Sequence, residues 1–551
     1  MRKLSILLLL VLCSGAALAD PTADFIQLRD AYLAKVKPLE REANDAWWEA
    51  STTGSEEAYA RRTKADNALA ELQSDREVFA KLKALKEQGL PDHGLNRQLT
   101  MMYLAFLPKQ ADPELNKQIN ALEADVEKIF NTHRSEVNGQ RLTENDVRKI
   151  LHETNDNDEA KAAWSGYMQV GREVEPKLKE LVKLRNQVAQ KLGFDNFFQL
   201  KLAQQELDQD ELFAIFDELD ELTRGPFGEL KDEIDAHMMK RFSLTKDQLR
   251  PWHTDDLFFQ EAPHLATVNL DQIYEGRDPV KLSEKHYKSM GMKVDDIIAR
   301  SDLYEKEGKS PHAFCTNIDR GQDIRVLCNV KPNANWMDTM HHELGHGVYD
   351  EYIGKDVPFL LHEPAHILTT EGMAMMFGAL TKNPEFIKEV VGVNDPALLA
   401  ESQRSLRAEK LIFSRWTQVM LRFERGMYEN PDQDLNALWW SLKKQYQNLN
   451  PPDDMSGADY GAKLHIVGAP CYYHNYMLGE LFASQVRAYA AKKYLGLDNP
   501  LKTSFYGSKE AGEYFRDQIF APGNTYDWRE LTKRATGEPL TARYYAKLYV
   551  K

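Results

Sequence analysis

The sequence predicts an all-α protein, one large helical domain built as two lobes around a cleft with at most a minor short β element. Three observations support this prediction. Strand patterns are nearly absent, several long segments carry apolar residues at three- and four-residue spacing, and no internal repeat, low-complexity linker or charge block divides the chain. The chain has 551 residues, of which 42% are hydrophobic, so it can bury a large core.

The N-terminus has the pattern of a secretory signal peptide. Arg2 and Lys3 precede an apolar run over 4–12, and the small-residue site Ala-Leu-Ala at 17–19 comes before Asp20. This run is too short to span a bilayer comfortably, and no later stretch is apolar enough to cross one. We therefore expect a signal peptide at 1–19, a single mature domain over 20–551, and a secreted or periplasmic protein with no stable membrane anchor.

Amphipathic helices are predicted over 21–50, 56–90, 111–135, 143–170 and 173–192, where Ala, Leu, Glu, Lys and Gln are frequent. Turn-forming residues at 91–94 and 193–196 separate some of these helices. The segment 324–328 alternates apolar and polar residues and is the one short strand that we predict.

Cysteines and charge restrict the function further. The mature chain would keep Cys315, Cys328 and Cys471; an oxidising compartment permits one disulfide, for which the first two are the closer pair, and Cys471 is then a small buried residue. The net charge of -15, with acids and bases interspersed, argues against nucleic acid as a partner, because a phosphate-binding surface needs clustered Lys and Arg.

A zinc-binding motif stands at 342–346, with the sequence His-Glu-Leu-Gly-His. His342 and His346, four residues apart, project from one face of a helix and can bind the same Zn²⁺, while Glu343 lies beside a zinc-bound water as general base. With 15 histidines and 85 acidic residues, this pattern arises by chance about 0.06 times per chain, so its surroundings matter. The helix is apolar on nearly all sides, so both histidines are expected to be buried. Buried histidines need polar partners, and a metal ion is the obvious one.

Glu371 is the predicted third ligand, 25 residues after His346. It lies in the first turn of an apolar helix that we expect to begin with a Thr cap at 369–370. Glu363 is the competing candidate, in a Pro-flanked segment that reads as a loop. The sequence therefore predicts one zinc ion per chain, bound by His342, His346 and Glu371 with a fourth position open.

Several segments resemble the angiotensin-converting-enzyme family of peptidyl-dipeptidases, and the chain looks like a secreted, bacterial-type member. His-His-Glu-Leu-Gly-His at 341–346 resembles the family's H-H-E-M-G-H, and the glutamate at 371 matches its third zinc ligand. His-Ala at 312–313 lies thirty residues before His342, as in the family. Further similar stretches are Ala-Trp-Ser-Gly-Tyr at 163–167, Leu-Arg-Asn at 184–186, Trp-Trp-Ser-Leu-Lys-Lys-Gln-Tyr-Gln at 439–447, Pro-Pro at 451–452, Gly-Ala-Lys-Leu-His at 461–465 and Tyr-His-Asn-Tyr at 473–476.

The resemblance, which runs from about residue 25 to the C-terminus, implies an all-helical, two-lobed fold with zinc deep in a cleft. It implies a hydrolase that releases dipeptides from peptides with a free C-terminal carboxylate, through a zinc-activated water. Glu343 would be general base and later proton donor, and Tyr476 would stabilise the oxyanion. The remaining roles are a substrate carbonyl held by His312 and His465, backbone contacts from Ala313, and a carboxylate bound by Lys463, Tyr473 and Gln260.

The sequence also departs from the family pattern. Met375 stands where the family has an acid that supports a zinc histidine, so this support must come from elsewhere or be absent. Lys443 and Asn475 replace two arginines associated with bound chloride, so strong chloride activation is not expected. The spacing from His465 to Tyr473 is one residue longer than in the family, which leaves the roles of Tyr472, Tyr473 and Tyr476 open.

Two other functions remain as alternatives. A zinc carboxypeptidase would release single C-terminal residues, as one branch of the family does; Lys463 and Tyr473, which that branch lacks, favour release of dipeptides. A non-catalytic peptide-binding protein is disfavoured because His342, Glu343, His346 and Glu371 are all present.

Overall fold

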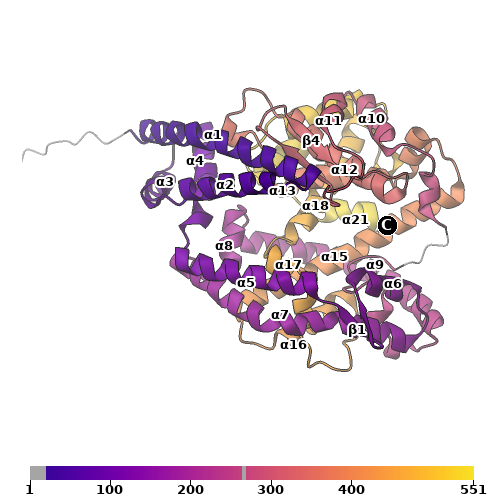
Figure 1. Ribbon diagram of the computed structural model, residues 1–551. Coiled ribbons are helices and arrows are strands. Elements are labelled where there is room, and N and C mark those ends of the chain that lie inside the picture. Colours follow the sequence, from indigo (N-terminus) through magenta and orange to yellow (C-terminus); the bar gives the residue numbers. More distant parts are fainter. Residues whose placement is uncertain (1–19, 264–267, 551) are drawn as a thin grey trace, which may run out of the picture.

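A computed structural model describes residues 20–263 and 268–550, and it confirms the all-α prediction (Figure 1). Two short antiparallel strand pairs are the only sheets in this part of the chain. The expected signal peptide at 1–19 lies outside the described residues. Within them, no helix is both long enough and apolar enough to cross a membrane.

The first four helices pack together at one edge of the molecule, in indigo in Figure 1. Asp20 caps the first of them by accepting a hydrogen bond from the N–H of Thr22, and Gly54 ends it with a φ of 70°. The group has a small apolar core of its own around Phe25 and Tyr32. Its members are α1 (Pro21–Thr53), α2 (Glu56–Gln73), α3 (Arg76–Gln88) and α4 (His93–Phe106).

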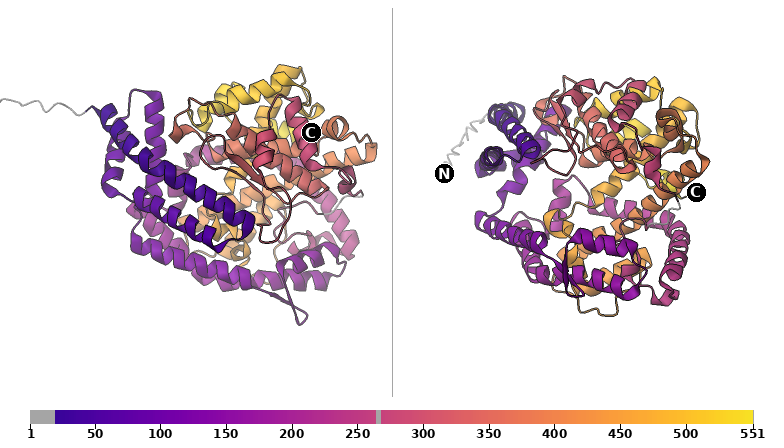
Figure 2. Two further views of the ribbon diagram at one scale, coloured as in Figure 1. Left: turned by 45° about the horizontal axis from the view of Figure 1, so that its top comes forward. Right: turned by 45° about the vertical axis from the view of Figure 1, so that its right-hand side comes forward.

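The other elements form two groups, which Figures 1 and 2 show on opposite sides of the molecule. The group around α7 contains α5 (Pro113–Thr132), β1 (Ser135–Val137), β2 (Gln140–Leu142), α6 (Glu144–Glu153), α7 (Asn157–Lys191), α8 (Phe197–Gln204), α9 (Gln209–Phe242) and α16 (Leu435–Gln447). The group around α12 contains α10 (Pro279–Ser289), α11 (Asp295–Arg300), β3 (Phe314–Asn317), β4 (Ile324–Leu327), α12 (Ala334–Glu351), α13 (Ile367–Leu380) and α14 (Pro384–Phe386).

The C-terminal third of the chain connects these two groups, so one large apolar core runs through both of them. Its helices are α15 (Pro396–Glu429), α17 (His465–Gly468), α18 (His474–Leu495), α19 (Lys509–Tyr514), α20 (Trp528–Thr536) and α21 (Arg543–Tyr549). Short 3-10 or π turns are η1 (Leu107–Gln110), η2 (Lys246–Gln248), η3 (Pro251–His253), η4 (Leu270–Ile273), η5 (Phe359–Leu361), η6 (Ile387–Val391), η7 (Asp459–Ala462), η8 (Pro500–Lys502) and η9 (Phe515–Phe520).

Helix α13 packs against both α12 and α18, and glycines make these contacts close. A Cβ atom on Gly345 would lie 2.8 Å from the Cα of Ala374, and one on Gly372 would lie 2.7 Å from the carbonyl oxygen of Gly479. Larger side chains at these positions would force the helices apart, because interiors are close-packed. The two glycines thus hold the His342 and Glu371 backbones close enough to share a site.

Several predicted boundaries were wrong. The segment 56–90 forms two helices, because the Asp75 side chain accepts hydrogen bonds from the N–H groups of Glu77 and Val78 and starts α3. The predicted break at 171–172 is absent, and α7 runs from Asn157 to Lys191. Gly171 does not end a helix; a Cβ there would lie 2.2 Å from the carbonyl oxygen of Ala458, so the glycine permits close packing against η7. The strand predicted at 324–328 is present as β4, whereas its partner β3 and the β1–β2 hairpin were not predicted.

Candidate active site

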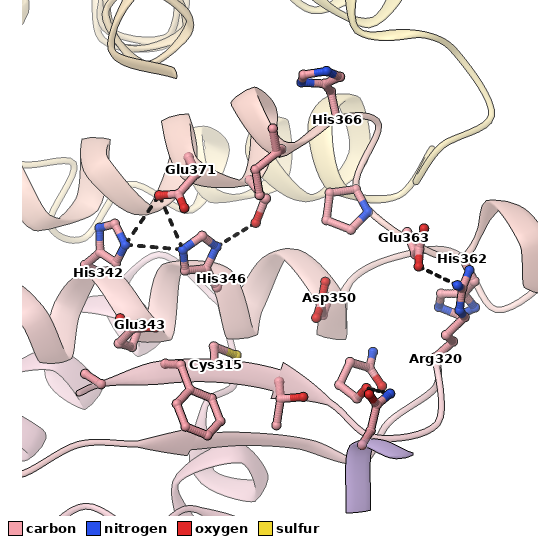
Figure 3. A pocket seen from close by; sticks show the side chains of 18 of the residues that line it. Cys315, Arg320, His342, Glu343, His346, Asp350, His362, Glu363, His366 and Glu371 are labelled. Carbon is pink, nitrogen blue, oxygen red and sulfur yellow. Dashed lines mark hydrogen bonds and ion pairs between the residues drawn. The ribbon is translucent and has the colours of Figure 1, made fainter. Parts of the chain in front are cut away.

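Helices α12 and α13 bring the three predicted metal ligands together. His342 and His346 lie one turn apart on the face of α12 that meets α13, and Glu371 points toward them from α13 (Figure 3). The predicted Thr cap was wrong: α13 begins at Ile367, and the ring of His366 caps it by accepting a hydrogen bond from the N–H of Leu368. Glu371 therefore lies in the second turn, directly opposite the histidines.

The donor atoms have the spacing that one zinc ion requires. The two Nε2 atoms are 3.2 Å apart, and each lies 3.8 Å from Oε2 of Glu371. A point equidistant from these three atoms is about 2.1 Å from each, the usual length of Zn–N and Zn–O bonds. Within the described residues this is the one group of three or more metal-binding side chains close enough to share an ion.

Electrostatics favour a cation at this point. Burial lowers the pKa of His342 to about 4 and that of His346 well below its usual value, so both rings are neutral at pH 7, as metal ligands must be. Burial also raises the pKa of Glu371 to about 7. Neutral imidazoles beside a carboxylate that lacks a counter-charge fit a divalent cation.

Thr370 supplies the support that Met375 cannot give. The hydroxyl oxygen of Thr370 lies 2.6 Å from Nδ1 of His346. When Nδ1–H donates to this oxygen, Nε2 keeps its lone pair for a metal. Thr370 was not predicted as a site residue, because a Thr at the expected start of a helix is typical of a cap.

We expect Thr370→Val to lower zinc affinity by about 10–100-fold, because the substitution keeps the shape of the side chain but removes the hydrogen bond that orients His346. Competition with a chelator of known zinc affinity measures the change. Thr370→Ser keeps a hydroxyl and should retain most of the affinity. Unchanged zinc affinity in the Val variant would show that the hydroxyl does not support the ligand.

Glu343 follows His342 directly on α12, points toward β3 and lines the same cavity as the three metal-binding residues; it is 8% exposed. Burial, with a smaller contribution from Glu371, raises the pKa of its carboxyl to about 8, and a hydrogen bond from the backbone N–H of Cys315 opposes this shift. The group is thus held in place and binds a proton readily near neutral pH, as a general base and acid requires.

Two cavities border the metal-binding residues, and His342 lines both. The β3 cavity, about 760 Å³, lies between α12, α13 and β3. It also contains Glu363, the competing ligand candidate, which instead forms an ion pair with Arg320 at 2.7 Å. The α15 cavity, about 370 Å³, lies on the other side of His342 and is lined by Gln260, Met375, Phe413 and Tyr473 among others.

Three residues predicted to bind a carboxylate come together beside the α15 cavity. Nζ of Lys463 donates a hydrogen bond to Oε1 of Gln260 at 2.6 Å, and it lies 5.6 Å from the ring centre of Tyr473. Lys463 is 6% exposed and has no ion pair within the described residues. Burial lowers the pKa of this ammonium to about 8. The remaining donors of a buried cation are therefore available to an anion.

The three tyrosines whose roles the sequence left open lie in two places. Tyr473 packs against Phe413 and Trp416, near Lys463. The charge of Glu371 raises the pKa values of both Tyr472 and Tyr476 in addition to burial, which places these two phenols near the metal ligands. Tyr476 contacts the rings of both other tyrosines, at centroid distances of 5.3 and 5.4 Å.

The structure brings together some of the other predicted residues and not all of them. The ring of His465 lies 5.2 Å from that of Tyr473, and Ala313 lines the β3 cavity. His312 is exposed in the loop before β3 and is not among the residues that line this cavity. Its expected contact with a substrate carbonyl therefore stays a prediction.

The cysteines are all free in the described chain. Cys315 faces Val326 across the β3–β4 pair, and Cys328 lies beyond the end of β4. The pair nearest in sequence is thus out of register for a disulfide. Cys471 is buried, as expected.

Comparison with known proteins agrees with this site. The family model described as angiotensin-converting enzyme matches residues 22–224 and 260–547. The chain belongs to the angiotensin-converting-enzyme family of peptidases. It is therefore a zinc metallopeptidase, a hydrolase, and the family resemblance predicted from the sequence is confirmed.

Three relatives illustrate how distant this membership is. Angiotensin-converting enzyme from Theromyzon tessulatum is 21% identical over 92% of this chain and 88% of its own length. Angiotensin-converting enzyme from Haematobia irritans exigua is 23% identical over 96% of this chain and 92% of its own length. The angiotensin-converting enzyme-like protein Ace3 from Mus musculus is 25% identical over 81% of this chain and 65% of its own length. All three are animal proteins, so the expectation of a bacterial-type member finds no support among them.

Two positions associated with chloride in the angiotensin-converting-enzyme family are occupied differently here. Nζ of Lys443 donates to the carbonyl oxygen of Phe258 at 2.6 Å, and burial lowers its pKa to about 7. The cavity beside it measures about 10 Å³, which is at most the space of one water. The amide of Asn475 is bound to Oε1 of Gln205 and to the carbonyl oxygen of Tyr472.

We therefore expect weak or no chloride activation. A neutral amide and a half-protonated lysine without adjoining space are poor anion ligands. The measurement is the rate of peptide cleavage as chloride replaces acetate at constant ionic strength. A strong rise with chloride would contradict this expectation.

Proposed function

We propose that this zinc peptidase removes dipeptides from the C-terminus of oligopeptides, the activity of a peptidyl-dipeptidase. Its substrates are peptides with a free C-terminal carboxylate. The observation that carries the proposal is Lys463, a buried ammonium that forms no ion pair with any described residue and lies beside the cavity that reaches His342. A buried cation of this kind is stabilised by an anion from outside the protein.

The α15 cavity has the size for the part of the substrate that leaves. Its volume of about 370 Å³ is at the lower end for small-ligand sites. Two residues of extended chain span at most about 7 Å, so a fixed ammonium can set which bond reaches the metal ligands. Gln260 and Tyr473 border the same cavity and can share the carboxylate through an amide N–H and a phenol O–H.

The site residues then have separate tasks. His342, His346 and Glu371 would hold the zinc ion, which supplies a Lewis acid that polarises the peptide carbonyl and acidifies water. The Glu343 carboxylate takes the proton of the attacking water and returns it to the departing amine. The Tyr476 phenol donates a hydrogen bond to the oxygen on which negative charge develops, and His465 orients the substrate backbone.

A secreted or periplasmic location belongs to this proposal, because residues 1–19 have the pattern of a signal peptide. N-terminal sequencing of the protein recovered outside the cytoplasm tests it. A mature chain that begins at Asp20 is the expected result.

The activity is tested by digestion of a defined decapeptide with a free C-terminus, followed by mass spectrometry of the products. Successive losses of dipeptides, together with about one zinc per chain, are the expected result. Release of single residues would show a carboxypeptidase. Binding without cleavage by the zinc-loaded protein would show a peptide-binding protein.

A further inference from the structure

Asp350 is a carboxylate that the proposed reaction does not use. It lies on α12 one turn after His346, lines the β3 cavity, and faces β3 from the same side of the helix as Glu343 (Figure 3). No hydrogen bond or ion pair of its side chain is formed with any described residue. Burial raises its pKa to about 7, and Glu363 contributes to the shift. The Asp350 carboxylate therefore has no cationic partner among the described residues.

The same end of the β3 cavity holds two more carboxylates and a single guanidinium. Arg320 binds Glu40 through two nitrogens, at 2.8 and 3.1 Å, and Glu363 through one, at 2.7 Å. Its charge is therefore shared between these two acids and is not available to Asp350. Three carboxylates against one cation leave this region with an excess of negative charge.

A second metal ion does not explain this arrangement. In the described residues only His342, His346 and Glu371 have ligand atoms close enough together to hold one. An organic cation with a long reach suits a carboxylate at the wall of a large cavity better.

The direction in which the peptide binds indicates that this cation is a side chain of the peptide itself. If the C-terminal carboxylate binds at Lys463 on the α15 side of His342, the part of the peptide before the scissile bond must continue into the β3 cavity. Four residues of helix rise about 6 Å, so Asp350 lies within reach of a Lys or Arg side chain on either of the two residues before that bond.

We propose that Asp350, with Glu363 beside it, makes the β3 cavity selective for peptides that carry Lys or Arg at one of the two positions before the scissile bond. This inference rests on the proposed function, because that function sets the direction of the peptide. The cation forms an ion pair with Asp350 in a partly enclosed site, where such pairs are stronger than on the surface.

The test compares N-acetylated pentapeptides that differ at one residue, Lys or its neutral isostere norleucine, placed at either position before the expected cut. Acetylation removes the N-terminal ammonium, which would otherwise compete for the same acids. The readout is kcat/KM for dipeptide release by the zinc-loaded full-length enzyme. We expect Lys to be preferred by about tenfold or more at one of the two positions.

Asp350→Asn removes the charge and keeps the shape of the side chain. The preference for Lys should fall to near one, while kcat/KM for the norleucine peptide stays within about twofold. Asp356→Asn is the matched control, because Asp356 is an exposed acid six residues further on that does not line the cavity. It should leave the preference unchanged.

Equal rates for Lys and norleucine peptides in the wild type would overturn the proposal, as would an Asp350→Asn variant that lowers both rates equally. If no dipeptide is released from any peptide, the proposed function is wrong. The same peptides are then compared by calorimetric binding to the zinc-loaded protein, where equal affinities of the Lys and norleucine forms overturn the role of Asp350.

Discussion

Glu343→Gln is expected to lower turnover by on the order of 10²–10⁴-fold or more, because glutamine keeps the shape of the side chain but cannot accept the proton of the attacking water. Zinc binding should be unaffected, since Glu343 is not one of the three residues whose ligand atoms lie close enough together to hold the ion. The measurements are kcat by single-substrate kinetics and zinc content of the purified variant.

Glu351→Gln on the same helix is the matched control. Glu351 lies two turns further along and lines neither cavity, so its variant should retain normal turnover. Near-normal turnover in Glu343→Gln would remove Glu343 from the mechanism. Loss of zinc in that variant would make it a structural support of the site, and the kinetic loss would then say nothing about proton transfer.

Much of the fold follows from local patterns. Amphipathic spacing identified the helices, and the His-Glu-Leu-Gly-His pattern identified the metal helix, since both depend on residues within a few positions of each other. Boundaries failed where a distant contact decided them. The predicted gap at 171–172 lies inside α7, where Gly171 contacts η7, and no local pattern indicates that neighbour.

The residues of the site likewise fall into those that local spacing predicts and those that depend on distant contacts. His342, His346 and Glu371 were named from spacing, and the structure places their ligand atoms together. The hydrogen bond between Thr370 and His346 and the partnerless carboxylate of Asp350 depend on how α12 packs against α13 and β3. Such contacts join segments that are far apart in sequence, so a single chain read alone does not reveal them.

Substitution of Lys463 is the second change that we expect to lower activity strongly. We expect Lys463→Ala to lower kcat/KM for a peptide with a free C-terminus by roughly 30- to 5,000-fold, which corresponds to about 2–5 kcal/mol of lost ion pairing in a buried site. Lys444→Ala, which removes an exposed lysine of α16, is the control and should have little effect. Kinetics on one defined peptide measure both variants.

The amidated form of the same peptide separates a direct contact from a structural role. If the ammonium of Lys463 binds the carboxylate, the wild type cleaves the amide far more slowly than the free acid, and Lys463→Ala loses this difference because neither form has a partner. The pKa of about 8 adds a second check: the ammonium is present below this pH and lost above it, so the preference for the free acid should fade as the pH rises past 8. Equal cleavage of acid and amide by the wild type, or release of single residues, would show that another group sets the position of the cut.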